Sequence, residues 1–250
     1  MLGGLLKSVG ASLGIGSPDA PVFAVPGQLS ALQIPTAGGL AEKAGVQLAP
    51  GAPVTRAHPP AQLLAYLLND QQDMLGATQA LAHGLSQRDA VAWAVDACRR
   101  VETRLPPEQR EAITAAEAVG TTPSAINRAS AATAAAKVGV EGPAGLAARA
   151  ASLVDVADAP PVPGADTLLP TCVVGAVASA VSCSAKPLKP PRQAAIPTSA
   201  TPVHPLNAVD NIALPPAPGA QHKARNATAF KPFIDAGLAL AAGAAPTRTA

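Results

Sequence analysis

Aromatic side chains are scarce in this sequence. One Trp, one Tyr and three Phe are spread over 250 residues. So few rings cannot build the stacked aromatic platform on which single-stranded nucleic acids are usually bound. Charge is nearly balanced as well, with 18 Lys and Arg against 16 Asp and Glu, and no run of like charge exceeds Arg99-Arg100. These features argue against nucleic acid as a partner.

Cysteine and histidine are also few, and their spacing matches no metal site. The three cysteines make an odd number, and the four histidines lie far apart in the sequence. Cys172 and Cys183 fall in one helical stretch, where they would lie roughly 16 Å apart, too far for a disulfide. We therefore expect no metal, no cofactor and a reducing compartment, the cytoplasm.

Long apolar runs are lacking too. The longest, around 173–181, falls short of the ~20 residues that a membrane-spanning helix needs, and no secretory signal stands out. Residues 1–16 could still form an amphipathic helix, although their glycines weaken it. Such a helix would dock on a membrane surface or a protein, whereas the plainer interpretation is a loose terminus. Its apolar face would carry Leu2, Leu5, Leu6, Val9 and Leu13.

Proline and small apolar residues dominate what is present. The chain has 27 prolines and 21 glycines, and hydrophobic residues make up 48% of it. Prolines gather in 17–60 and 186–222, which indicates a linker or a surface-lying arm in the first range and disorder in the second. Elsewhere apolar residues recur at helical spacing. The predicted fold class is all-α: an Ala-rich bundle or array of short antiparallel helices with Pro-rich disordered segments.

The same pattern divides the chain into four segments. We expect a flexible N-terminal segment over 1–59, a helical domain over 60–185, and a Pro-rich disordered linker over 186–223. A C-terminal helix over 224–245 carries enough apolar surface to pack on the domain. Start and stop signals predict the helices of the domain itself, at about 60–68, 74–85, 86–105, 107–119, 123–138, 143–154 and 172–184.

The clearest helical pattern follows Ser86, which forms a near capping box with Asp89. Trp93 and Cys98 fall on one broad apolar arc of this helix, so we predict that both face the core. Asp96 and Arg100 are four residues apart and can form a surface ion pair. The face opposite the arc carries charged and polar side chains, namely Arg88, Asp89, Asp96, Arg99 and Thr103.

Four short motifs follow one another along the chain. The first joins Leu81-Ala82-His83-Gly84-Leu85 to Arg88-Asp89-Ala90-Val91-Ala92-Trp93-Ala94. The others are Ala115-Ala116-Glu117-Ala118-Val119, then Asn127-Arg128 before an alanine run, and Gly142-Pro143-Ala144-Gly145. In order and spacing they resemble an uncharacterised family of Ala-rich helical bacterial proteins, numbered 6931 among domains of unknown function. The likeness covers about 60–185 and 225–243.

The resemblance implies a helical domain with a protein partner. Members of the family often occur near type VI secretion genes, which implies an accessory or adaptor role. Glu117, Asn127 and Arg128 belong to the motifs and are expected to be structural, with Glu117 either on a solvated helix face or accepting a buried hydrogen bond. The sequence departs from the family at Ala92, where a second Trp is usual, so its partners are expected to differ.

The sequence gives little support for catalysis. His83 and Cys98 could form a base and nucleophile, but a thiol on a buried arc is usually inert. Trp93 is either a core residue or an anchor for a partner, and Arg88 and Arg99 are candidate partner-binding residues. We predict a non-catalytic adaptor. Two alternatives stay open: a membrane-peripheral protein held by residues 1–16, and a small-ligand or enzymatic site in a groove between helices.

Overall fold

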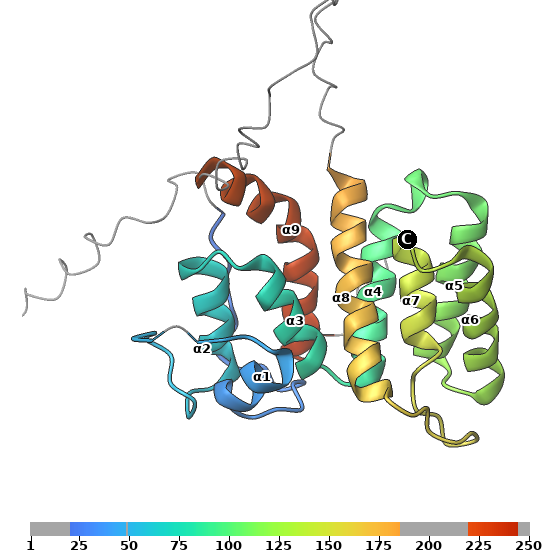
Figure 1. Cartoon of the computed structure of the whole chain (residues 1–250), viewed down its shortest axis with the longest axis horizontal. Coiled ribbons are helices and arrows are strands. Elements are labelled where there is room, and N and C mark those ends of the chain that lie inside the picture. Colours follow the sequence, from blue (N-terminus) through green and yellow to red (C-terminus); the bar gives the residue numbers. More distant parts are fainter. Residues whose placement is uncertain (1–20, 49, 186–219, 245–250) are drawn as a thin grey trace, which may run out of the picture.

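The computed structural model describes residues 21–48, 50–185 and 220–244 (Figure 1). Every regular element in these ranges is helical, so the all-α prediction is confirmed for them. Residues 1–16, where an amphipathic helix was considered, and most of the predicted linker, 186–219, lie outside the described residues. The α-helices are α1 (Ala37–Ala44), α2 (Pro60–Ala65), α3 (Met74–Gly84), α4 (Gln87–Arg100), α5 (Pro107–Thr121), α6 (Ala125–Val138), α7 (Pro143–Ala151), α8 (Ala165–Ser184) and α9 (Ala220–Ala241).

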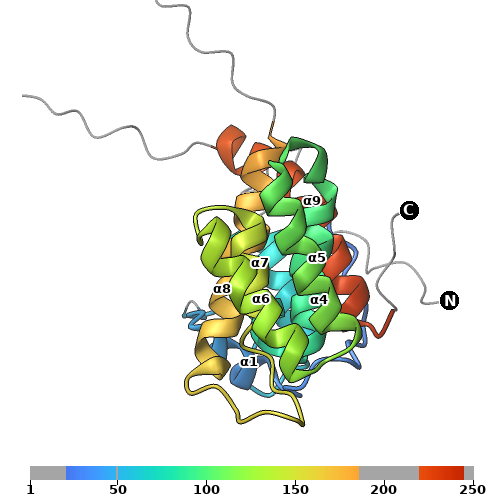
Figure 2. The same cartoon turned by 90° about the vertical axis from the view of Figure 1, so that its right-hand side faces the viewer.

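The helices form two adjoining groups. Helices α4 to α8 pack as a bundle in which α4 contacts α5, α7 and α8, and α6 contacts α5 and α7. Helices α1, α2, α3 and α9 lie beside this bundle, and α3 and α9 both contact α8 (Figure 1). Figure 2 shows α6 on the outer side of the bundle, away from α9. Helix α8 therefore lies at the boundary between the two groups, and α4 also contacts α3 and α9 across it.

Three helices begin at the capping serine or the prolines that predicted their starts. The Ser86 hydroxyl accepts the backbone N–H of Asp89 at 3.1 Å and donates to its carboxylate at 2.6 Å, so the predicted cap of α4 is confirmed. Pro107 and Pro143 lie in the first turns of α5 and α7. Proline suits these positions because its fixed φ matches a helix and its missing N–H would have no partner there.

Several helix ends differ from the predictions. Asp73 caps α3, accepting the N–H of Gly76 at 2.9 Å, and α6 begins at Ala125 after its cap Ser124, two residues later than predicted. Helix α3 ends at Gly84, one residue before its predicted end, and α5 ends at Thr121, two residues beyond its predicted end. Neither Gly84 nor Gly120 has the positive φ that glycine often takes at a helix end.

The core is one continuous cluster that runs through both groups. Many of its fully buried side chains are alanines, such as Ala90, Ala94 and Ala97 on α4. Short side chains let helix backbones approach closely, but each buries little apolar surface. Larger side chains, among them Trp93 and Ile113, fill the remaining space. Trp93 and Cys98, which helical spacing placed on the buried arc of α4, are both fully buried.

Residues 21–59 pack on the domain, where the sequence predicted a flexible segment and a domain starting at residue 60. Phe23 and Leu40 are buried, and α1 contacts α2 and α3. The Asn69 side chain holds the extended backbone of Phe23, accepting its N–H at 2.9 Å and donating to its carbonyl at 3.1 Å. Frequent prolines remove helical periodicity from this range, but they leave its apolar side chains free to pack. We call residues 21–35 the N-terminal strap.

Helix α8 begins at Ala165, seven residues before the predicted start, and carries Pro170 within its second turn. By length and composition this 20-residue helix is apolar enough to cross a membrane, contrary to the prediction that no stretch is long enough. The prediction counted only an unbroken apolar run, and the threonines and serines of α8 interrupt it. In the fold, α8 packs against α3, α4, α7 and α9.

Candidate functional site

Trp93 lies in the core and contacts the backbone of α9. Its side chain is fully buried, and its indole N–H donates to the carbonyl of Phe233 at 2.8 Å. A Cβ atom on Gly237, one helical turn further along α9, would lie 2.7 Å from the indole ring. Only glycine therefore fits against this ring without displacement. Trp93 is thus a core residue, one of its two predicted roles, and it is α9 that covers it.

Helix α9 contacts α3, α4 and α8, and we call the part of these three helices that it covers the α9-binding surface. Phe233, Ile234 and Leu238 of α9 are buried there, together with Ala241. The strap covers the C-terminal end of α9, where the Ala31 N–H donates to the carbonyl of Ala241 at 3.0 Å. Helix α9 is thus held by apolar side chains along its length and by the strap at its end.

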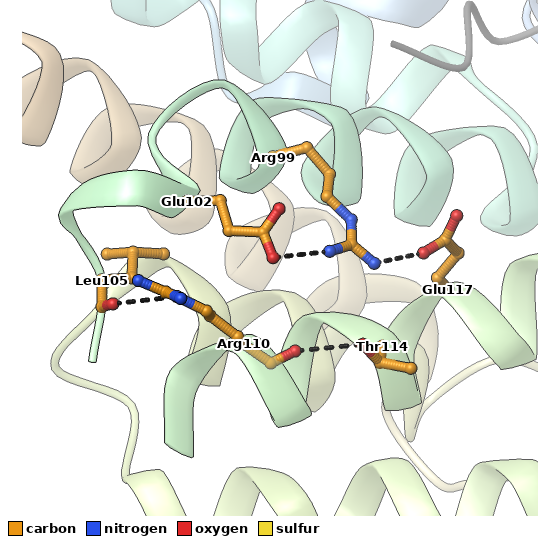
Figure 3. A network of polar contacts seen from close by, with 6 residues as sticks. All are labelled: Arg99, Glu102, Leu105, Arg110, Thr114 and Glu117. Atoms are coloured by element: carbon orange, nitrogen blue, oxygen red, sulfur yellow. Dashed lines mark hydrogen bonds and ion pairs between the residues drawn. The ribbon is translucent and has the colours of Figure 1, made fainter. Parts of the chain in front are cut away.

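Arg99 joins α4 to α5 through two carboxylates (Figure 3). Its guanidinium contacts Glu102 at 2.8 Å and Glu117 at 2.5 Å. Burial disfavours the charge of Arg99, but its hydrogen bonds to Glu117 and Glu102 outweigh that effect and raise its pKa. Glu117 therefore accepts an ion-pair hydrogen bond while its side chain stays 43% exposed, so it is not a buried acceptor.

Arg110 lies near this ion-pair cluster and fixes the turn between α4 and α5 through separate hydrogen bonds (Figure 3). Its Nε donates to the carbonyl of Leu105 at 3.2 Å, just before α5 begins. Its own carbonyl accepts the hydroxyl of Thr114 at 3.2 Å, one turn later. These contacts order the backbone around the two carboxylates that Arg99 bridges. The cluster is a structural joint between two helices.

Two further arginines close the C-terminal ends of neighbouring helices. Arg88, at the start of α4, donates to the carbonyl of Gly120 at 2.6 Å and to that of Thr121 at 3.1 Å, in the last turn of α5. Arg104 donates to the carbonyls of Cys183 and Ser184, the last residues of α8. These carbonyls lack partners within their helices, and the negative end of the helix dipole favours a cation there.

The Asn127-Arg128 motif fixes the start of α6. The Asn127 amide donates to the carbonyl of Thr122 at 2.8 Å, and Arg128 donates to that of Pro160 at 3.0 Å. Asp158 accepts the N–H of Ala125 with its two oxygens, at 2.9 and 3.1 Å. The motif therefore ties α6 both to the end of α5 and to the loop between α7 and α8.

Close contacts explain why glycine occupies two positions of the fourth motif. A Cβ on Gly145 would lie 1.7 Å from the carbonyl oxygen of Gly139, which itself adopts a φ of +74°. A Cβ on Gly142 would lie 3.0 Å from the side-chain amide of Gln109 in α5. The turn between α6 and α7 is therefore folded tightly on the first turn of α7, and a side chain at Gly145 would open it.

The titratable groups weighed for catalysis have environments that disfavour it. Burial raises the pKa of the Cys98 thiol, and nearby Cys183 adds to the effect, so the reactive thiolate is suppressed. Burial and the charge of Lys43 lower the pKa of His83. In the described ranges, no group of three or more His, Cys, Asp and Glu could hold a metal ion.

These contacts define an all-α domain in which the polar side chains of its motifs join one helix to another. Residues 64–201, over half of the chain, match the family of unknown function DUF6931, and the chain belongs to this family. No curated protein and no solved structure matches the chain. Helices α1 and α9 lie outside the matched residues, although they pack on the part that matches.

The sequence reasoning missed three residues that build these contacts. Gly237 was not singled out, although glycine within an apolar helical stretch signals a close approach. Arg104 was not singled out either, although basic residues after a helix often cap a neighbour. Asn69 was not singled out, and no local signal could have revealed its partner Phe23, 46 residues away.

Proposed function

We propose that this protein is a non-catalytic accessory or adaptor protein of bacterial type VI secretion that binds a protein partner in the cytoplasm. Its family gives no activity, so support for the proposal comes from how the molecule uses its polar groups. The secretion context is supported by the association of the family, noted above, with type VI secretion genes. The free thiols of Cys98, Cys172 and Cys183 support a reducing compartment.

One observation supports the non-catalytic part of this proposal: the polar side chains of the motifs are used to join helices. Arg88, Asn127 and Arg128 donate to backbone carbonyls at helix ends, and Arg99 is held between two carboxylates. A catalytic site needs polar groups that converge on a space where a reacting atom can sit. Side chains that bond to carbonyls of their own chain do not converge in this way. The motifs therefore support a scaffold whose function is carried by its shape.

Affinity capture of the full-length chain from its native bacterium tests the proposal. After cross-linking, we expect one protein to be enriched in constant ratio over an untagged control. Two matched variants, Ile126→Glu and Val22→Glu, change apolar side chains that are 78% and 79% exposed, on α6 and on the strap. Because neither lies in the core, both should fold, and loss of the partner with only one of them would locate the binding surface. Failure to enrich any protein reproducibly would contradict an adaptor role.

A further inference from the structure

We propose that the α9-binding surface is a helix-binding site, and that an amphipathic helix of a partner protein can take the place of α9 on it. This inference rests on the proposed adaptor function and names the surface and the chemistry of the ligand. In the structure, α9 occupies this site as an intramolecular ligand. The contacts of α9 define what a competing helix must present.

The side chains that α9 buries have the spacing of a helix bound in a groove. Such ligands place apolar anchors at intervals of three and four residues along one face. The opposite face of α9, with Pro232, Asp235 and Ala239, is exposed to solvent. Lys231 lies at the edge between the two faces, where it pairs with Asp235 at 2.8 Å and lies 5.1 Å from the centre of the Phe23 ring of the strap. The buried or half-buried face carries Phe230, Phe233, Ile234, Gly237, Leu238 and Ala241. One face thus recognises the surface, and the exposed face is free to vary.

Three hydrogen bonds go to backbone carbonyls of α9 and of the residue that follows it. Trp93 donates to the carbonyl of Phe233, the Ala31 N–H to that of Ala241, and the Ser30 hydroxyl to that of Ala242 at 3.3 Å. A backbone carbonyl is offered by any helix, so these hydrogen bonds do not require the sequence of α9. The steric requirement lies at Gly237, where a Cβ would strike the indole ring. A competing helix therefore needs a glycine over Trp93 and large apolar residues three and four positions before it.

The position of α9 in the chain allows such exchange. Residues 186–219, 34 in all, separate it from α8, and it lies outside the residues that match the family. A stretch of that length spans ~110 Å when extended, while the end of α8 and the start of α9 lie at the same end of the molecule (Figure 1). The connection therefore does not force α9 onto its surface. A tethered ligand acts at an effective concentration of about millimolar. A competing peptide in solution therefore binds more weakly to the wild-type chain than to a variant whose own α9 cannot dock.

Fluorescence of the single Trp tests the site in the full-length chain. In a Gly237→Leu variant, the new side chain keeps α9 off Trp93, and we expect emission to shift to longer wavelength. Adding a synthetic peptide of residues 220–244, which contains no Trp, should restore the wild-type emission saturably. The same peptide carrying Gly237→Leu is the matched control and should restore nothing. A folded variant that the wild-type peptide leaves unchanged would overturn the proposal.

A second design covers the case in which Gly237→Leu prevents folding, as circular dichroism would reveal. The wild-type chain receives a specific protease site between residues 200 and 210 and is cut after folding. A dye-labelled peptide of residues 220–244 should then replace the cut α9 fragment, raising its fluorescence anisotropy. Absence of exchange would overturn the proposal, as would exchange explained entirely by dimers that share α9 between two copies. Neither design needs the natural partner, so its outcome is separate from that of the capture experiment.

Discussion

The indole N–H of Trp93 in α4 donates to the carbonyl of Phe233 in α9, 140 residues further along the chain, at 2.8 Å. One side chain therefore contributes both apolar burial and a polar contact to the position of α9. These two contributions can be measured separately.

Trp93→Ala should lower the free energy of unfolding by ~3–5 kcal/mol, because it removes a large, fully buried ring and leaves a cavity. Trp93→Phe keeps an aromatic ring but loses the donor, and should cost about 1 kcal/mol for the hydrogen bond in addition to a smaller loss of burial. Urea unfolding followed by circular dichroism measures both. Equal stability of the two variants would show that the ring contributes no packing of its own.

Gly145→Ala should destabilise the chain by about 1–3 kcal/mol, because the new methyl group meets the carbonyl oxygen of Gly139 and the backbone must move. Gly120→Ala provides the matched control, since a Cβ at that helical position meets nothing within 4 Å. It should stabilise the chain by about 0.5–1 kcal/mol through helix propensity. Thermal unfolding of both variants is the measurement. A neutral Gly145→Ala would mean that the turn between α6 and α7 is wider than described.

The Arg99–Glu117 ion pair should contribute little to stability. Its side chains are 29% and 43% exposed, so solvent screens their attraction. A double-mutant cycle with Arg99→Met and Glu117→Gln should give a coupling below about 1 kcal/mol that shrinks with added salt. The more exposed Lys137–Glu111 pair should show weaker coupling in the same cycle. A large coupling independent of salt would indicate that the joint between α4 and α5 is sealed from water.

His83 should make stability fall on acidification. Its pKa is lowered in the folded chain, so the unfolded chain takes up the proton first as the pH drops. The free energy of unfolding therefore falls from the ordinary pKa of 6.5 down to the folded pKa and changes no further from this group below it. Urea midpoints across this range should show a smaller decline in His83→Gln than in the wild type. Lys43→Met should reduce the decline in part, and identical slopes in all three chains would refute the assignment.

Cys98 should resist alkylation in the folded chain. Its thiol is fully buried and its pKa is raised by burial, whereas Cys172 and Cys183 are partly exposed. Iodoacetamide followed by mass spectrometry should label these two cysteines first and Cys98 only after denaturant is added. Rapid labelling of Cys98 in buffer would show that the contact between α4 and α8 opens readily.

Local signals in the sequence predicted the middle of the fold well. Ser86, Pro107 and Pro143 mark helix starts because capping depends on residues only a few positions away. The inward direction of Trp93 and Cys98 followed from helical spacing for the same reason. Each of these predictions needed only one turn or one face of a single helix.

The contacts that assemble the helices could not be predicted in this way. Arg88 was assigned to an exposed face, and nothing nearby showed that it caps α5, 32 residues on. Residues 21–59 carry no periodicity, so the burial of Phe23 depends on a surface formed by later segments. Likewise, Gly237 acquires its steric role only from Trp93. Such features depend on tertiary packing, and local patterns in one sequence carry no information about it.

The strap has a consequence for how the chain is made. Ser30 is synthesised 212 residues before Ala242, whose carbonyl it binds. Until α9 emerges, Ser30 and Ala31 of the strap lack their acceptors and Trp93 lacks Phe233, so two parts of the nascent domain stay incomplete together. A chain interrupted before α9 would display both parts to chaperones and proteases at once, which gives the cell a means to distinguish finished molecules from truncated ones.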